Sequence, residues 1–149
     1  MRAVLQRVSR AKVTVNNKVA GEIGPGLVVL LGVGAEDTAD AAKTMAERLA
    51  NLRIFEDADG KMNRSLLDVQ GSALVISQFT IYGDARGQRR PSFMAAARPE
   101  KARIVYEELC TALRSLGLPV QTGIFQASMS LELVNEGPVT ILLDSEKIF

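Results

Sequence analysis

A Gly-Pro step inside a strand-like region near the C-terminus constrains this chain more than any other feature. Residues 129–134 and 139–143 are apolar, alternating runs that predict strands, and Gly137-Pro138 lies between them. Proline has no N–H for a hydrogen-bond ladder, so it belongs at a sheet edge, a bulge or the first residue of a strand. Glycine lets a ligand or another backbone approach closely. The step is either a turn that links two strands or a rigid backbone feature with a cis bond, and its own residues leave both interpretations open.

The N-terminal part of the chain is also strand-like. Apolar alternation predicts strands at residues 3–15, 18–23 and 27–33. The first of these changes phase around Ser9-Arg10, which indicates a bulge or bend. Asn16-Asn17 is typical of a tight hairpin turn, and Gly24-Pro25-Gly26 predicts a second reversal. Strands joined by such short turns indicate an antiparallel meander.

Two helices are expected, at residues 38–52 and 99–116, because apolar side chains recur there with helical spacing. Asp37 is placed to cap the first helix, and Gly117 to stop the second. Between the helices we expect a short strand at 53–55 and a longer one at 73–82. The 149 residues, with no repeat or linker, predict one domain, 1–149, with an α/β fold of the α+β type.

The composition excludes several kinds of site. The chain has no histidine, which removes Ser-His and Cys-His pairs and the common zinc sites, and Cys110 is its only cysteine. The segment 57–60 is similar to part of a calcium loop, but its glycine is misplaced, so we expect a turn there. The longest apolar run, 27–31, is too short to span a bilayer, and no signal-peptide pattern is present. We therefore expect a cytoplasmic protein with no membrane partner.

Positive charge is unevenly distributed, although the net charge is only +1. One segment holds six basic residues and a single acid, Glu100. The basic residues are Arg86, Arg89, Arg90, Arg98, Lys101 and Arg103. A patch that contacts phosphates and a solvated loop both explain this segment. Arg7 shares the parity of the apolar Leu5, and we expect it to extend its charge to the surface.

Hydroxyl and backbone groups remain for catalysis. Ser77 and Thr80 follow an apolar run, but no base lies beside them in the sequence. Without histidine, a threonine nucleophile needs a lysine, a carboxylate or an N-terminal amine. Backbone N–H groups at the end of a strand can instead form an oxyanion hole for acyl transfer. A strand that simply emerges into solvent would show the same change from apolar to polar residues.

Two separated motifs, Ser77-Gln78-Phe79-Thr80 and Asn135-Glu136-Gly137-Pro138-Val139-Thr140, resemble the paired signature of the D-aminoacyl-tRNA deacylases. Further similar segments are Gln6-Arg7-Val8, Arg53-Ile54-Phe55, Arg90-Pro91-Ser92-Phe93, and Thr122-Gly123 before Phe125. The resemblance covers essentially the whole chain. It implies a small, barrel-like, mostly antiparallel sheet with flanking helices in a homodimer. It also implies an editing hydrolase, without metal or cofactor, that cleaves the ester of D-aminoacyl-tRNA and of glycyl-tRNA mischarged on tRNA-Ala.

The resemblance also implies roles for individual residues. Gly137 and Pro138, joined by a cis bond in the family, would reach into the partner subunit's site, exclude an L side chain and hold the substrate's amino group. The catalytic wall would consist of Ser77, Gln78, Phe79 and Thr80, assisted by the substrate's own 2′-hydroxyl. The residues implied for substrate binding are Arg7, Phe125, Ala127, Met129 and Asn135. From the basic segment, Arg89 and Arg90 are expected to contact the tRNA. A steric wall makes physical sense, because D and L substrates offer the same functional groups.

One segment departs from the family pattern, which reads Phe, Gly or Ala, Ala, Asp, Met. Here Gln126 is bulkier and Ser128 replaces the acid. The departure concerns the part of the site that would hold the terminal adenosine. Two rival hypotheses remain: a non-catalytic RNA-binding module, and a related deacylase in which a trans Gly-Pro bond admits some L substrates. A plain structural domain would leave the polar residues at 77–80 unexplained.

Overall fold

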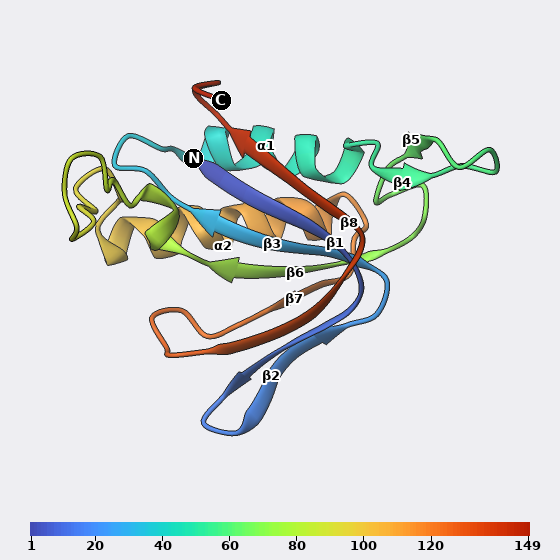
Figure 1. Cartoon of the computed structure of the whole chain (residues 1–149), viewed down its shortest axis with the longest axis horizontal. Coiled ribbons are helices and arrows are strands. Elements are labelled where there is room, and N and C mark those ends of the chain that lie inside the picture. The colour runs from blue at the N-terminus through green and yellow to red at the C-terminus, as the bar shows by residue number, and fades with distance from the viewer.

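One curved sheet and two helices make up the molecule, and the helices lie side by side against one face of the sheet (Figure 1). The computed structural model describes all 149 residues. The strand order in the sheet is β2-β1-β3-β6-β7, and β8 pairs with the other edge of β1. In chain order the elements are β1 (Arg2–Val15), β2 (Lys18–Ile23), β3 (Gly26–Gly32), α1 (Ala39–Asn51), β4 (Phe55–Glu56), β5 (Met62–Arg64), β6 (Ser72–Ser77), the 3₁₀ turn η1 (Phe79–Tyr82), α2 (Pro99–Ser115), β7 (Val120–Thr122) and β8 (Ser130–Asp144).

The first three strands form one long hairpin, so the expected meander is wrong. β3 returns along β1 and continues the line of β2: Ala11 faces Ile23 and Val8 faces Gly26 in the same antiparallel frame. The chain therefore bends at Pro25 without reversing, because proline interrupts the ladder but the second arm stays on the same edge of β1. The expected phase change lies where β1 leaves β3 and joins β2. The turn at Asn16 and Asn17 is confirmed, with φ of 49° and 62°.

β8 carries the Gly-Pro step as a bulge within one strand, so the interpretation as a turn between two strands is wrong. Both halves of β8 pair with β1 in the same direction. Gln6 faces Thr140 and Val8 faces Asn135, so the single residue Arg7 lies opposite four residues of β8. These four residues loop out because proline cannot donate to the ladder.

The helices connect strands that run parallel. β3 pairs with β6, and β6 with β7, in parallel, while the other pairings are antiparallel. Thr38, and not Asp37, caps α1: its hydroxyl accepts the N–H of Ala41 at 3.3 Å. The predicted end of α2 is confirmed at Gly117, whose φ of 92° suits glycine. No helix of the structure is long and apolar enough to span a membrane.

Two apolar clusters fill the molecule. The larger lies between the helices and the sheet, and it includes Leu5, Leu31, Leu49 and Leu109, each at most 1% exposed. The smaller lies inside the curve of the sheet around Leu74. The curve places the end of β6 beside the start of α2 and the loop before β8, and the functional site forms there.

Candidate active site

The strand that carries the Ser-Gln-Phe-Thr motif ends earlier than its sequence predicts. β6 stops at Ser77, and the chain then forms the η1 turn, so Gln78 and Thr80 do not alternate with Phe79 as strand residues. The N–H of Gln78 donates to the carbonyl of Leu31 at 2.7 Å, which is the last bond to the neighbouring strand. The N–H groups of Phe79 and Thr80 open the turn, and opening residues have no partner within a helical turn.

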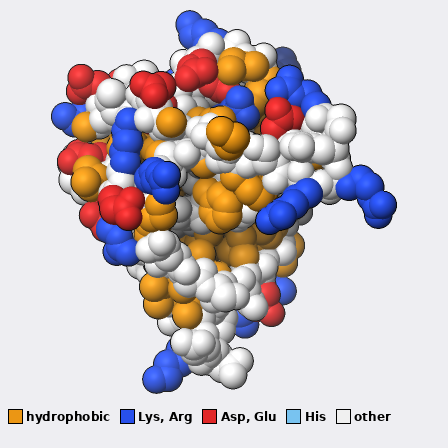
Figure 2. All heavy atoms as spheres, turned by 90° about the vertical axis from the view of Figure 1, so that its left-hand side faces the viewer, with side chains coloured by type: hydrophobic (Ala, Val, Ile, Leu, Met, Phe, Trp, Pro, Cys, Tyr) orange, Lys and Arg blue, Asp and Glu red, His pale blue; other side chains and the backbone are white.

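A pocket of about 820 Å³ opens beside this turn. Its lining is mainly apolar, and Figure 2 shows apolar side chains gathered in a hollow with Lys and Arg side chains on two sides of it. The lining residues that the sequence predicted as site residues are Ser77, Gln78, Phe79, Phe125, Ala127 and Met129. Segments far apart in the chain are therefore brought together as one site.

Aromatic side chains shape the pocket mouth. The rings of Phe79 and Phe93 meet edge to face with centroids 5.1 Å apart, and Phe79 is 57% exposed. Phe125 lies deeper against Tyr106, with centroids 5.9 Å apart. The hydroxyl of Tyr106 donates to the carbonyl of Val75 at 2.8 Å, so this ring is fixed from below. Ring faces and edges of this kind suit a flat ligand such as a nucleobase.

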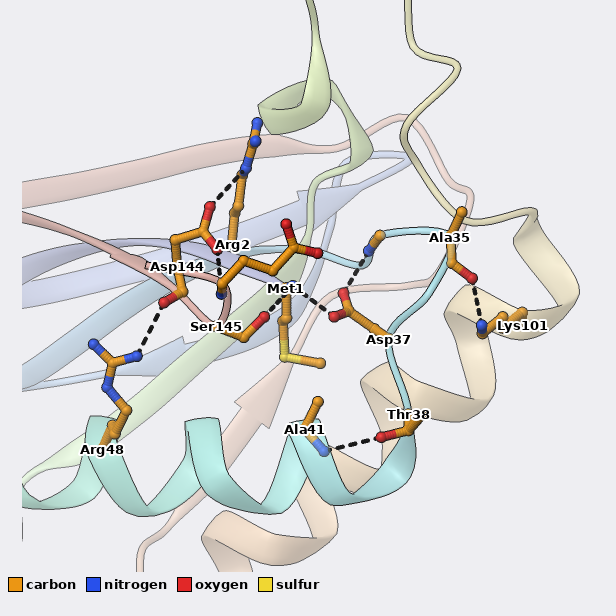
Figure 3. A network of polar contacts seen from close by, with 12 residues as sticks. Met1, Arg2, Ala35, Asp37, Thr38, Ala41, Arg48, Lys101, Asp144 and Ser145 are labelled. Carbon is orange, nitrogen blue, oxygen red and sulfur yellow. Dashed lines mark hydrogen bonds and ion pairs between the residues drawn. The ribbon is translucent and has the colours of Figure 1, made fainter. Parts of the chain in front are cut away.

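The loop that forms the outer wall is anchored to the end of β3. The N–H of Ala97 donates to the carbonyl of Val33 at 2.9 Å, and the N–H of Ala35 donates to the carbonyl of Ala95 at 3.1 Å. Lys101 donates to the carbonyl of Ala35 (Figure 3).

Asp37 fixes the same turn. It is 6% exposed, accepts the N–H of Gly34 at 2.6 Å and takes the α-ammonium of Met1 at 2.6 Å (Figure 3). Asp37 was expected to cap a helix. It instead uses both carboxylate oxygens on these tertiary partners, which leaves the cap to Thr38.

The hydroxyl of Thr80 has no base beside it. Its oxygen accepts a hydrogen bond from the side-chain amide of Gln78, and no lysine or carboxylate bonds to it. An amide cannot remove the proton of a hydroxyl, so Thr80 is not set up as a nucleophile. No three Asp, Glu or Cys side chains gather where they could hold a metal ion. The groups available at the wall are the two free N–H groups and neutral side chains.

Arg7 lies under the bulge of β8, and the expectation that it extends to the surface is wrong. It is 6% exposed. Its Nε donates to the carbonyl of Glu136 at 3.1 Å, and its Nη1 donates to the carbonyl of Ile54 at 2.8 Å. Its Nη2 lies 3.8 Å from the carboxylate of Glu56. The buried guanidinium thus ties the bulge to the segment that precedes β4.

Asn135 closes the bulge from within. Its side-chain oxygen accepts the N–H of Val139 at 2.8 Å, and its amide donates to the hydroxyl of Thr140 at 3.1 Å. Gly137 has a φ of 126°, which side chains rarely adopt, and the Gly137-Pro138 bond is cis. Both residues are exposed at the tip of the bulge.

The basic segment divides by what its members contact. Arg86 forms an ion pair with Asp84 at 2.7 Å, which holds the pKa of that carboxyl well below its usual value. Arg89 and Arg90 are exposed, form no ion pair and lie outside the pocket lining.

Comparison with known proteins decides the family. The model of the D-Tyr-tRNA(Tyr) deacylase family matches residues 4–144. The chain belongs to this family. A D-aminoacyl-tRNA deacylase of Fervidobacterium nodosum is 58% identical over 149 residues, 100% of each chain. One of Symbiobacterium thermophilum is 60% identical over 149 residues, 100% of this chain and 99% of that one. The family and the enzyme class inferred from the two motifs are thereby confirmed.

Solved structures share the fold of this deacylase. The c-Myc DNA Unwinding Element Binding Protein superposes with a TM-score of 0.90 at 39% identity, covering 97% of this chain and 98% of that one. A probable eukaryotic D-amino acid tRNA deacylase superposes with a TM-score of 0.81 at 20% identity, covering 95% and 97%. The barrel-like α+β fold expected from the resemblance is confirmed.

The deacylase separates its predicted site residues into two groups. The motif at the end of β6 meets Phe125, Ala127 and Met129 in the pocket, whereas the bulge residues do not line it. The sequence analysis assigned no role to Met94, which is 92% exposed at the pocket mouth, or to Arg98. The available signal was an apolar Phe-Met pair inside a basic segment, which a purely solvated loop does not need.

Proposed function

We propose that this chain hydrolyses the ester of D-aminoacyl-tRNA, and of glycyl-tRNA mischarged on tRNA-Ala, to free amino acid and tRNA. The observation that carries the proposal is the pocket at the end of β6, where the family's Ser-Gln-Phe-Thr motif meets an aromatic wall. The pocket has room for an adenosine and a small aminoacyl group. The relatives at 58–60% identity carry the name D-aminoacyl-tRNA deacylase over their full lengths.

The chemistry uses water, backbone groups and the substrate. Water attacks the ester carbonyl, the N–H groups of Phe79 and Thr80 stabilise the oxyanion, and the ribose oxygen leaves with a proton. The substrate's neighbouring 2′-hydroxyl assists by donating a hydrogen bond to the reacting oxygens. This assignment fits a chain without histidine, in which Thr80 bonds only to the amide of Gln78. We expect full activity in the presence of a chelator.

Gly137 and Pro138 provide the steric wall against L substrates. The bulge is exposed yet held from within by Asn135 and from below by Arg7, so it is a firm surface. A firm surface is needed, because an L substrate differs from a D substrate only in where its side chain points.

The wall comes from a second copy of the chain. In one chain the bulge does not line the pocket that holds the catalytic motif, so a single copy lacks the wall. A homodimer in which each bulge enters the partner's pocket would complete two sites. The substrate's amino group would then bond to carbonyls of the bulge.

The experiment is single-turnover hydrolysis of matched D- and L-tyrosyl-tRNA by the purified chain, with chelator present. Loss of the D ester alone is the expected result. Loss of both esters would contradict the steric wall while leaving a deacylase. Loss of neither, with tRNA still bound, would support a non-catalytic RNA-binding module.

A further inference from the structure

Two arginines at the pocket mouth have no acidic partner. Arg98 lines the pocket, and the guanidinium carbon of Arg103 lies 4.8 Å from the ring centroid of Phe125, which also lines it. Both arginines are exposed, and none of the five ion pairs of the chain involves either of them. The acids nearest along the helix, Glu100 and Glu107, leave them unpaired. Their charge is therefore available to a ligand.

The other basic residues of the segment are either occupied or more distant. Arg86 is bound to Asp84, and Lys101 donates to the backbone of Ala35. Arg89 and Arg90 lie on the loop outside the pocket lining. Only Arg98 and Arg103 combine free charge with a position at the pocket.

The contact with Phe125 leaves the hydrogen-bonding capacity of Arg103 intact. A guanidinium stacks on a ring through its flat face, while its five N–H donors point outward in the plane. Arg103 can thus be held in place by the pocket wall and still bind two oxygens of a phosphate. Stacking also fixes the side chain before a ligand arrives, which reduces the entropy lost on binding.

The pocket itself demands such a contact. Its mainly apolar lining can bury a base and an ester, but a phosphodiester cannot be buried there without a partner. A nucleotide seated in the pocket must therefore lead its phosphate out through the mouth. Figure 2 shows Lys and Arg side chains standing beside the apolar hollow on this face.

We propose that Arg98 and Arg103 bind the phosphodiester groups of the last nucleotides of the RNA strand whose 3′-terminal ester enters the pocket. The inference rests on the proposed function and deepens it. It assigns these two residues to the strand end, and leaves Arg89 and Arg90 to phosphates farther along the tRNA. Contacts at the strand end operate on a short substrate, and contacts farther along do not.

The test compares D-tyrosyl esters of a trinucleotide with the 3′-terminal sequence of tRNA and of full-length tRNA. The variants are Arg98→Ala and Arg103→Met, in which the methionine keeps an apolar stem against Phe125. We expect each to raise KM about fivefold on both substrates, with kcat within about twofold, because only a phosphate contact is lost. The dependence of log K on log salt for the trinucleotide should become shallower by about 0.7 per lost contact. Arg103→Lys keeps the charge and should keep the salt slope.

Arg114→Ala is the matched control. It lies on the same helix, roughly 16 Å from Arg103 by helical rise, and should change neither KM nor the salt slope. Unchanged KM in Arg98→Ala and Arg103→Met would overturn the inference. So would a loss confined to kcat, which would mean that Arg103 only supports Phe125, or a rise in KM on full-length tRNA alone. A wild-type chain that hydrolyses neither substrate would instead refute the proposed function.

Discussion

Replacing Gly137 by alanine tests the bulge as a rigid wall. A Cβ at this position would lie 2.8 Å from Cγ2 of Val139 and 3.0 Å from Nη2 of Arg7, at a φ of 126°. The backbone conformation alone costs a non-glycine residue about 1–3 kcal/mol. Neither neighbour moves easily, because Val139 is 7% exposed and Arg7 is held by the carbonyls of Glu136 and Ile54. The bulge must therefore shift or the fold must lose stability.

We expect Gly137→Ala to lower the free energy of unfolding by about 2–3 kcal/mol, and Tm by about 5–10 °C. The displaced bulge should also raise the rate on L-tyrosyl-tRNA relative to the D ester. Urea denaturation and single-turnover hydrolysis of both esters measure these effects. Gly60→Ala is the control: its φ is 74°, and no atom lies within 4 Å of its added Cβ. It should cost about 1 kcal/mol and leave the ratio of D to L rates unchanged. Wild-type stability and selectivity in Gly137→Ala would refute the reasoning.

Three further predictions concern the wall, the basic loop and alkaline stability. Thr80→Ala should lower kcat by less than about tenfold, because the hydroxyl only bonds to an amide, and an acyl-enzyme trapped on Thr80 would contradict this. Replacing Arg89 and Arg90 by alanine should weaken tRNA binding and reduce its salt slope by roughly 1–2, whereas an unchanged slope would mean a merely solvated loop. Burial raises the pKa of the Cys110 thiol from 9.0 to about 11. The unfolded chain therefore releases this proton first, and the free energy of unfolding should fall by about 2 kcal/mol between pH 9 and 11. Burial also raises the pKa of Tyr106, which acts in the same direction, so Cys110→Ala should remove only part of the fall measured by urea denaturation.

Local patterns predicted the elements whose causes are local. The strand at Lys18–Ile23 and the end of α2 at Gly117 follow from alternation and from helical spacing with a glycine stop, and the structure has them there. The errors have tertiary causes. Asp37 is a good cap by type, but a buried ammonium and the N–H of Gly34 compete for its oxygens. Pro25 interrupts a ladder in the same way whether the chain reverses or merely bends, so the long hairpin was beyond local reasoning.

The site was predictable in its residues but not in its assembly. The Ser-Gln-Phe-Thr motif, Phe125 and Met129 are all in the pocket, yet periodicity could not place the outer wall, because that wall is an irregular loop anchored by backbone bonds to Val33. Arg7 was misjudged for a related reason. Its partners, the carbonyls of Glu136 and Ile54, come from segments far away in the chain, and no pattern around residue 7 reveals them.

The measurement that tests the account most directly is complementation between two inactive subunits. Ala127→Trp fills the pocket and leaves the bulge intact, while Gly137→Val distorts the bulge and leaves the pocket intact. Each variant alone should lose most of its activity on D-tyrosyl-tRNA. A mixed dimer, isolated by two different tags, combines one intact pocket with one intact bulge. The account predicts up to half of the wild-type rate, selective for the D ester. Folded mixed dimers without recovered activity, or a wild-type chain active as a monomer, would contradict it.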